Sequence, residues 1–315
     1  MGRYLLVDGG QSGCRIAYVV DGERVGGAGA SGLSRQAGDR AAGVLRALER
    51  VLAEIEPRPD AVETVVAGLT GFDGSPESAR EISAGIRALV QSERVSVTSD
   101  DVTSYLGAVG LEPGAVAAAG TGVIVLAGDL DGNHARGDGW GYILGDEGSG
   151  YYVGRRGLAS ALRAHEGRGG SEALWRLAEA KLGTPQVIKR RVYGASNPVS
   201  EVAAFTREVA EAAREGDAEA AGIWADAARE VASTAVATLR RVFDPGYPAT
   251  VSWTGSLFEA RDLMLEPFKR HVAELWPDAR LLAPKGTALD GAELLARSDS
   301  APMFGPLVYV SRGGS

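Results

Sequence analysis

Two strand–turn–strand segments, Val7–Val20 and Ala117–Leu126, constrain the fold of this chain more than any other feature. In each segment, an apolar run of strand length leads into a glycine-rich turn with one hydroxyl side chain, and a second apolar run follows. Two apolar runs joined by such a turn predict a β-hairpin. The repetition indicates an internal structural duplication, and the alternative interpretation is a chance similarity between two hairpins.

The first hairpin opens a region in which strand and helix patterns alternate. A third strand is predicted at 24–30, followed by a helix at 34–52, a strand at 62–69, a helix at 78–90, a strand at 95–98 and a short helix at 102–109. This alternation predicts an α/β fold in which helices flank a mixed sheet. Ligands of such sheets bind beyond the carboxyl ends of the strands, where Asp8, Gly71 and Asp100 are all expected.

Pro113-Gly114 marks the expected domain boundary in a chain of 315 residues, which is long enough for two domains. We therefore expect one domain at 1–113 and a second at 114–315. The second should contain strands at 115–119, 123–128 and 250–253, and helices at 151–166, 171–182, 185–193, 199–214, 217–242 and 257–275. A final short helix near Asp290 is expected either to stay with the second domain or to pack back toward the first.

The segment Gly137–Gly154 combines seven glycines with three carboxylates, Asp138, Asp146 and Glu147. Glycine allows a close approach of backbone to ligand, and carboxylates accept hydrogen bonds from hydroxyl groups. Apolar residues from Trp140 to Leu144 interrupt the glycines, which is unlike a flexible linker. We interpret the segment as an ordered loop that leads into a helix and holds a small polyhydroxylated ligand. The alternative is a glycine-rich turn between two strands.

Composition excludes several classes of function. The net charge of −8 argues against a nucleic-acid binder that works through a broad basic face. Cys14 is the single cysteine, so neither a disulfide framework nor a cysteine-based metal site is expected. The longest apolar runs have the length of strands rather than of membrane spans. We therefore expect a soluble cytoplasmic protein without a membrane or nucleic-acid partner.

The two hairpins and a third strand that ends in Thr254-Gly255-Ser256 resemble the actin-like ATPase and sugar kinase superfamily. Within it, the block Gly139–Tyr152 is similar to the signature of the N-acetylglucosamine kinases, which sit in the BadF/BadG/BcrA/BcrD ATPase family. The resemblance extends from about Tyr4 to Ala296. It implies two ribonuclease H-like domains with an active-site cleft between them, and it makes a homodimer the expected assembly.

The resemblance also implies roles for individual residues. Three turns would bind ATP: Gly9, Gly10 and Ser12 in the first, Gly120, Thr121 and Gly122 in the second, and Gly255 with Ser256 in the third. Asp8 matches the residue that holds Mg²⁺ through water, and Asp100 matches the catalytic base. Asp101 should point the other way if the strand continues that far. The implied sugar-binding residues are Ser34, Gln36, Asp100, Gly139, Trp140, Gly141, Asp146 and Glu147.

The resemblance implies transfer of phosphate from Mg-ATP to an amino sugar, with O6 of N-acetylglucosamine as the expected acceptor. Four positions depart from the family pattern: Val123 replaces a serine, Ile124 a polar residue, Gln36 an asparagine and Gln11 a glycine of the first turn. These changes leave glucosamine, N-acetylmannosamine and N-acetylmuramic acid open as substrates. Two further alternatives are an ATPase regulator of the same fold and a sugar sensor. The sensor predicts the loss of Asp8 or Asp100, and both are present.

Overall fold

The fold is seen in a computed structural model that describes residues 2–10, 13–31, 40–72, 74–129, 131–298 and 301–313. Three residues with expected roles, Ser12, Ser34 and Gln36, lie outside these ranges. The chain forms two compact units. Unit 1 comprises residues 1–116, 126–134 and 282–315, and unit 2 comprises residues 117–125 and 135–281.

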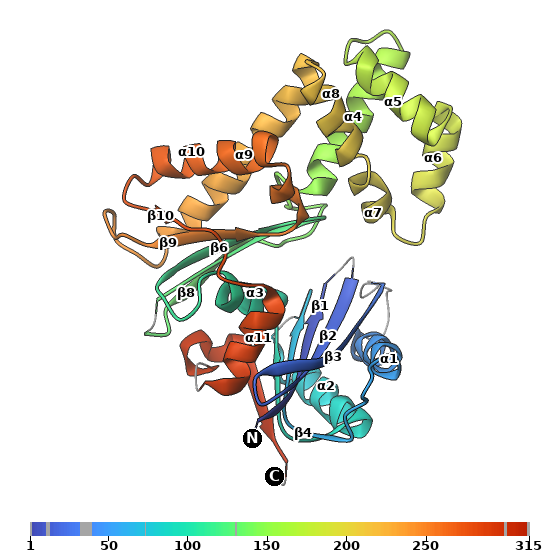
Figure 1. Ribbon diagram of the computed structural model, residues 1–315. Helices are drawn as coiled ribbons and strands as arrows, with labels where there is room; N and C mark the ends of the chain where they lie inside the picture. Colours follow the sequence, from blue (N-terminus) through green and yellow to red (C-terminus); the bar gives the residue numbers. More distant parts are fainter. Residues whose placement is uncertain are drawn as a thin grey trace. The chain divides into compact units, whose positions relative to one another are not determined.

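Unit 1 is built on a six-stranded mixed sheet with the order β11-β5-β4-β1-β2-β3 (Figure 1). The strands are β1 (Arg3–Gly9), β2 (Gly13–Val20), β3 (Glu23–Ser31), β4 (Ala61–Leu69), β5 (Gln91–Thr98) and β11 (Val308–Arg312). The first three form the antiparallel meander that the first hairpin predicts, and β1, β4 and β5 are parallel. Parallel strands end at one edge of the sheet, so β1 and β5 bring Asp8 and the residues after Thr98 to the same edge.

Helices cover both faces of this sheet. They are α1 (Arg40–Ala53) and α2 (Pro76–Leu89) on one face, and α3 (Asp100–Ala108) and α11 (Ala288–Arg297) on the other. Successive side chains of a strand point to opposite faces. Accordingly, Leu5 and Val7 of β1 join the core beneath α1 and α2, and Leu6 joins the core beneath α3 and α11. Strands buried on both faces explain why the sequence reads as continuous apolar runs.

The second sheet has five strands in the order β10-β9-β6-β7-β8. The strands are β6 (Gly114–Ala119), β7 (Val123–Gly128), β8 (His134–Asp138), β9 (Thr250–Thr254) and β10 (Arg280–Leu281). The helices of unit 2 are α4 (Gly150–His165), α5 (Glu172–Leu182), α6 (Pro185–Gly194), α7 (Pro198–Ala203), α8 (Thr206–Arg214), α9 (Ala218–Leu239) and α10 (Glu266–Leu275). Short helical turns, η1 (Ser256–Glu259) and the π-type η2 (Arg261–Leu265), join β9 to α10, and η3 (Ala301–Leu307) precedes β11 in unit 1.

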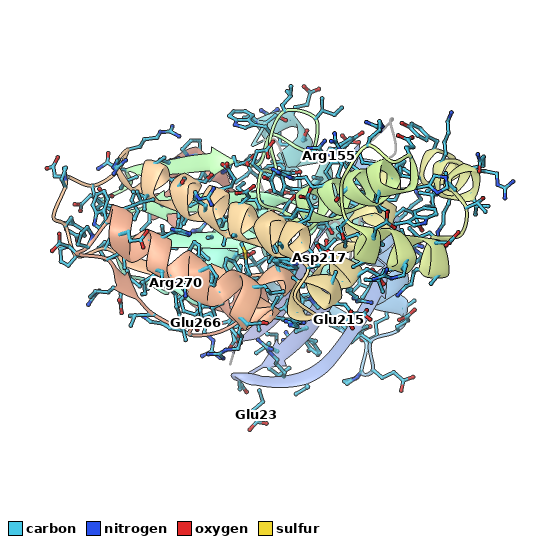
Figure 2. All side chains as sticks on the ribbon, turned by 90° about the horizontal axis from the view of Figure 1, so that it is seen from above. Glu23, Arg155, Glu215, Asp217, Glu266 and Arg270 are labelled. Atoms are coloured by element: carbon cyan, nitrogen blue, oxygen red, sulfur yellow. The ribbon has the colours of Figure 1, made fainter. Side chains whose placement is uncertain are left out.

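Helix caps fix the layout of unit 2. Asp217 begins α9 by accepting a hydrogen bond from the amide of Ala220 at 2.8 Å, and it lies at the start of that long helix in Figure 2. The hydroxyl of Ser171, the residue that caps α5, donates to Asp217 at 2.7 Å. One carboxylate therefore ties two helix starts together. The cap that the sequence predicts at Ser171 is present.

The sequence predicts one domain boundary near residue 113, but unit 1 is made of three separate stretches of the chain. Residues 282–315 belong to unit 1, where α11 packs on α3 and β11 extends the sheet beside β5. The approach of α11 is close because glycines face each other: a Cβ on Gly291 would lie 2.4 Å from the backbone nitrogen of Gly107. β11 was not expected from the sequence, because its short run follows closely after Gly305 and Pro306.

Two expected helices are also divided. The predicted helix at 199–214 forms as α7 and α8, with the break at Ala204 and Phe205. Phe205 is buried at this break, where the chain turns to pack on α4. The predicted helix at 257–275 forms as η1, η2 and α10, and Pro267 stands in the first turn of α10, where its missing N–H costs no hydrogen bond. Within the described residues, no helix combines the length and apolar character that crossing a membrane requires.

Candidate active site

In unit 1, the first acidic residue of the site is Asp8 near the end of β1. Its carboxylate is buried, with 6% of the residue exposed. Arg15 from the neighbouring strand β2 lies directly opposite in the ladder, and its Nη2 and Nε donate to Asp8 Oδ2 at 2.6 and 3.1 Å. A buried carboxylate needs a cationic partner, and the exposed guanidinium of Arg15 supplies one here.

Asp100 is the second carboxylate at this edge. It is the first residue of α3, directly after the N-cap Ser99, so it belongs to a helix start rather than to the strand end. The pKa of Asp100 is raised to about 7, first by burial and then by the negative charges of Asp101 and Asp8. A hydrogen bond from the hydroxyl of Thr70 opposes this rise. Asp100 keeps partial exposure, so its proton can exchange with solvent or substrate.

Asp101 differs from Asp100 in its surroundings. It is 1% exposed, and the hydroxyl of Ser99 donates a hydrogen bond to its carboxylate. The expectation that strand alternation would separate the two aspartates does not hold, because the helix begins at Asp100 and both lie in its first turn. The separation arises from burial instead. Asp101 is enclosed by protein, and Asp100 is the partly exposed member of the pair.

Thr70 was not singled out as a functional residue from the sequence. It follows β4, its backbone N–H donates to Gly9 O at 2.7 Å, and its side chain contacts Asp100. It therefore connects the first glycine turn to the second carboxylate. The signal in the sequence was its place in Thr70-Gly71, directly after a buried strand at the same edge as Asp8.

The first glycine turn is tight, because the Gly10 N–H donates to Gly13 O at 2.8 Å. Cys14 follows it and is fully buried. Burial, with a smaller contribution from Asp8, raises the pKa of the Cys14 thiol to about 11. A thiol with so high a pKa is a poor nucleophile, which agrees with its expected role as a packed small residue.

In unit 2, the second glycine turn is anchored to the start of α4. The N–H groups of Gly150 and Tyr151 donate to the carbonyls of Gly120 and Thr121 at 2.8 and 3.1 Å. A Cβ on Gly120 would meet no atom within 4 Å, so the space beside this glycine is open. An open turn held near the start of a 16-residue helix suits an anion, because the helix macrodipole is positive there.

Gly255 lies beside this turn. Its φ is +101°, and a Cβ would come within 2.2 Å of Ala119 O, so only glycine fits. Ala119 is the last residue of β6, immediately before Gly120. Gly255 and Ser256 are both exposed. The structure thus brings the second and third predicted ATP turns together within unit 2.

The loop after β8 is ordered around Asp138. Its carboxylate accepts hydrogen bonds from the backbone N–H groups of Trp140, Asp146 and Glu147, at 3.4, 2.9 and 3.2 Å. Asp138 itself has a φ of +59°, which asparagine and aspartate tolerate better than most residues. From the sequence, Asp138 is one of three carboxylates in this segment and has no individual role assigned to it. Its position before Gly139 was the available signal for a side chain that organises a turn.

Asp146 joins the same loop to the second hairpin. It also has a φ of +59°, it is 9% exposed, and its Oδ1 accepts from the Val123 N–H at 3.0 Å. A Cβ on Gly122 would lie 2.8 Å from that oxygen, so the glycine allows the approach. Glu147 and Gly139 are exposed, Gly141 is buried, and Trp140 is 76% exposed. Asp146 therefore holds the loop in place as well as being a candidate ligand.

The expected residues thus fall into two groups. The first group lies at one edge of the unit 1 sheet and consists of Asp8, Gly9, Gly10 and Asp100. The second group belongs to unit 2 and consists of Gly120, Thr121, Gly122, Gly139, Trp140, Gly141, Asp146, Glu147, Gly255 and Ser256. The described residues contain no group of three or more His, Cys, Asp or Glu side chains suited to a metal ion. A magnesium ion that keeps most of its waters needs only one or two carboxylates, and Asp8 supplies one carboxylate near the end of β1, next to the first glycine turn.

This combination of glycine turns and carboxylates agrees with the family comparison. Residues 7–289 match the BadF/BadG/BcrA/BcrD ATPase family, and the chain belongs to it. The resemblance seen in the sequence is thereby confirmed, and with it the use of ATP as the nucleotide of the family.

Three relatives are more specific. The chain is 27% identical over 237 residues to an N-acetylmuramic acid/N-acetylglucosamine kinase of Clostridium acetobutylicum, covering 75% of this chain and 77% of the relative. It is 25% identical over 261 residues to an N-acetyl-D-glucosamine kinase of Dictyostelium discoideum, covering 80% and 81%. A crystal structure of a proposed N-acetylglucosamine kinase from Chromobacterium violaceum is similar, with a TM-score of 0.77, 28% identity, and coverage of 95% and 99%.

Proposed function

We propose that this protein is an ATP-dependent kinase that phosphorylates an amino sugar, with N-acetylglucosamine converted to N-acetylglucosamine 6-phosphate. The observation that carries the proposal is Asp100, a partly exposed carboxylate whose pKa of about 7 is suited to a general base. The named activities of the two curated relatives support an amino sugar as the acceptor.

Asp100 would accept the proton of the attacking hydroxyl as the new phosphorus–oxygen bond forms. Phosphoryl transfer depends mainly on positioning and on neutralising charge, and a carboxylate near the acceptor is sufficient as the base. Thr70 orients Asp100 through its hydrogen bond and keeps the pKa from rising further. Asp101 is enclosed and bonded to Ser99, so it sets the charge next to the base without contacting the substrate.

ATP would be held by the glycine turns, with Gly120, Thr121 and Gly122 around its terminal phosphates and Gly255 against the adenosine. Asp8 would hold the Mg²⁺ of Mg-ATP through water, and the ion supplies neutralisation of the phosphate charge. Arg15 donates two hydrogen bonds to Asp8 Oδ2 and so orients that carboxylate.

The sugar would contact the loop after β8, with Asp146 and Glu147 as hydrogen-bond acceptors and Trp140 as an exposed aromatic surface. Three backbone bonds to Asp138 support this assignment, because a loop so fixed can present its side chains in one arrangement. Val123 and Ile124, at the start of β7, have no side-chain hydrogen-bonding groups. Their side chains would therefore contribute little to the recognition of a polar N-substituent of the sugar.

The proposal is tested by measuring ADP release with Mg-ATP and glucose, glucosamine, N-acetylglucosamine, N-acetylmannosamine or N-acetylmuramic acid. N-acetylglucosamine should give the highest kcat/KM. Asp100→Asn should lower kcat by about 10²–10⁴-fold, the usual contribution of a general base, and leave sugar binding largely intact. Asp60→Asn, at an exposed position of the same unit, is the matched control. Absence of turnover with every sugar would refute the proposed kinase activity. Full activity of Asp100→Asn would rule out Asp100 as the general base.

A further inference from the structure

Three tyrosines gather around the first turn of α4, next to the loop that is proposed to hold the sugar. Tyr142 comes from that loop, Tyr151 from the first turn of α4, and Tyr193 from the last turn of α6. The rings of Tyr142 and Tyr151 meet edge to face, with their centroids 5.1 Å apart. Tyr142 is 42% exposed, Tyr193 is 82% exposed, and Tyr151 is partly buried. All three belong to unit 2.

The position of Tyr193 beside α4 depends on the packing of the next helix. α7 begins five residues after Tyr193, and it packs on α4 where Gly154 has no side chain: a Cβ there would lie 2.1 Å from Val202 O. Burial raises the pKa of the Tyr151 phenol, and the phenols of Tyr142 and Tyr193 raise it further. The side chain of Tyr193 therefore lies within electrostatic reach of Tyr151.

Arg155 adds a cation to the tyrosines. It is exposed, it is labelled in Figure 2, and it lowers the pKa of Tyr151, which precedes it by one helical turn on the same face of α4. Among the described residues, its guanidinium forms neither an ion pair nor a hydrogen bond. Arg156 differs, because it donates to the hydroxyl of Tyr152 at 2.6 Å and lies 3.4 Å from the carboxylate of Asp226. The N–H groups of Arg155 are therefore available to a ligand.

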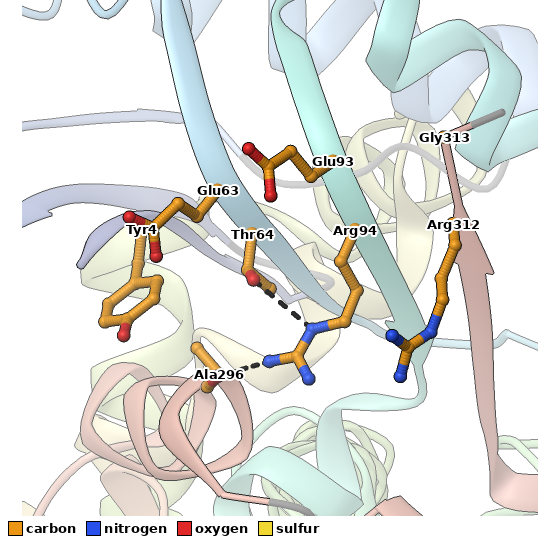
Figure 3. A pocket seen from close by; sticks show the side chains of 8 residues that line it. All are labelled: Tyr4, Glu63, Thr64, Glu93, Arg94, Ala296, Arg312 and Gly313. Atoms are coloured by element: carbon orange, nitrogen blue, oxygen red, sulfur yellow. Dashed lines mark hydrogen bonds between the residues drawn. The ribbon is translucent and has the colours of Figure 1, made fainter. Parts of the chain in front are cut away.

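Arg94, in a pocket of unit 1, is not available in this way (Figure 3). Its Nε donates to Thr64 Oγ1 at 3.2 Å, and its Nη2 donates to Ala296 O. Glu63 and Glu93 line the same pocket and offset its positive charge. The bonds of Arg94 tie the last turn of α11 to the sheet, so this arginine has a structural role.

Exposed aromatic rings beside a sugar-binding loop suit a saccharide. The face of an aromatic ring carries partial negative charge, and the weakly positive C–H groups of a pyranose ring pack against it. Arginine N–H groups donate to the oxygens of the same ring. Single exposed apolar residues are common on proteins, but adjoining ones mark binding surfaces. The contact between Tyr142 and Tyr151 helps to order the loop, but it does not account for Tyr193 and Arg155 beside it.

We propose that a second saccharide unit binds at a subsite formed by four residues of unit 2: Tyr142, Tyr151, Arg155 and Tyr193. This proposal rests on the proposed function, because the ring to be phosphorylated must lie at the loop after β8. Tyr142 stands between Trp140 and Asp146 in that loop, so the subsite adjoins the place of the first ring. The acceptors then include disaccharides in which the amino sugar is joined to another sugar.

The experiment compares N-acetylglucosamine with its β-1,4-linked disaccharide, in which each ring carries the other as a substituent. Calorimetric titration of the full chain without nucleotide measures binding, and ADP release with Mg-ATP measures phosphorylation. The disaccharide should bind at least about tenfold more tightly than the monosaccharide, as expected from added aromatic and charge-assisted contacts. It should also release ADP with the lower KM.

Variants of the subsite separate the two rings. Tyr193→Ala should weaken binding of the disaccharide about two- to tenfold, the usual size of one aromatic contact, and leave binding of the monosaccharide unchanged. Tyr193→Phe keeps the ring and should bind the disaccharide as wild type does. Arg155→Gln should weaken disaccharide binding about tenfold through the loss of a charged donor. Arg176→Gln removes the same charge at an exposed position of α5 and is the matched control.

The outcomes distinguish this subsite from the proposed kinase activity. If wild type binds the disaccharide no more tightly than the monosaccharide, the subsite is refuted and the kinase activity is unaffected. Equal weakening of both sugars by Tyr193→Ala or Arg155→Gln would also overturn the subsite, because it would indicate a general effect on the sugar loop. Absence of binding and turnover with both sugars would refute the proposed function, and this inference with it.

Discussion

Replacing Asp100 by asparagine should change stability in a way that depends on pH. The pKa of this carboxyl is about 7 in the folded protein and about 3.8 in the unfolded chain, mainly because burial disfavours the charged form. A raised folded pKa contributes stability that is complete below pH 3.8 and is lost as pH rises through 7. Asparagine does not titrate, so the variant escapes this loss.

The size of the effect follows from the shift. At about 1.4 kcal/mol for each pKa unit, the wild type should lose about 3 kcal/mol relative to Asp100→Asn between pH 5 and pH 9. Urea unfolding of both proteins across this range, in Mg²⁺-free buffer, measures the difference. Asp60→Asn is exposed and should give a constant offset. A difference between wild type and Asp100→Asn that stays constant from pH 5 to pH 9 would refute the assignment of a raised pKa, and with it the reason for choosing Asp100 as the base.

Further predictions concern the surroundings of the site and the core. Thr70→Val removes a hydrogen bond that lowers the pKa of Asp100, so the acid limb of the kcat/KM–pH profile should move above pH 7; an unchanged limb contradicts this. Asp138→Ala leaves three backbone N–H groups without their acceptor, so amide exchange at Trp140, Asp146 and Glu147 should accelerate and the KM for sugar should rise, whereas Asp131→Ala should change neither. Gly291→Ala places a Cβ 1.9 Å from Thr103 O and should destabilise unit 1 by about 1–3 kcal/mol, as measured by urea unfolding. Gly43→Ala, where no atom lies within 4 Å in α1, should instead stabilise it by about 0.5–1 kcal/mol.

The first half of unit 1 could be predicted from the sequence because local patterns determine it. Continuous apolar runs bounded by glycine turns gave β1, β2 and β4, and the spacing of apolar residues gave α1 and α2. The separation of Asp100 from Asp101 could not be predicted in this way. It depends on where α3 begins and on the bond from Ser99, both of which arise from packing.

In the C-terminal segment, too, local sequence patterns predict an element but not its packing. An amphipathic pattern indicates that a helix forms near Asp290, but it does not specify the partner, which the glycine contact between α11 and α3 determines. β11 is a short strand after a proline, and it becomes recognisable only through its pairing with β5. The roles of Thr70 and Asp138 could not be predicted from the sequence either. Thr70 acts through a hydrogen bond to Asp100, which is distant in the chain, and Asp138 accepts hydrogen bonds from backbone groups beyond the next turn.

The return of residues 282–313 to unit 1 has a consequence for the order of folding. Until this segment has left the ribosome, the face formed by Leu6, Val66 and Val102 lacks its cover of Leu295 and Phe304. All residues of unit 2 are therefore synthesised while this apolar surface of unit 1 still lacks part of its cover. Exposed apolar surface of this kind favours association between chains, so the partly synthesised protein is more prone to aggregation than the complete one.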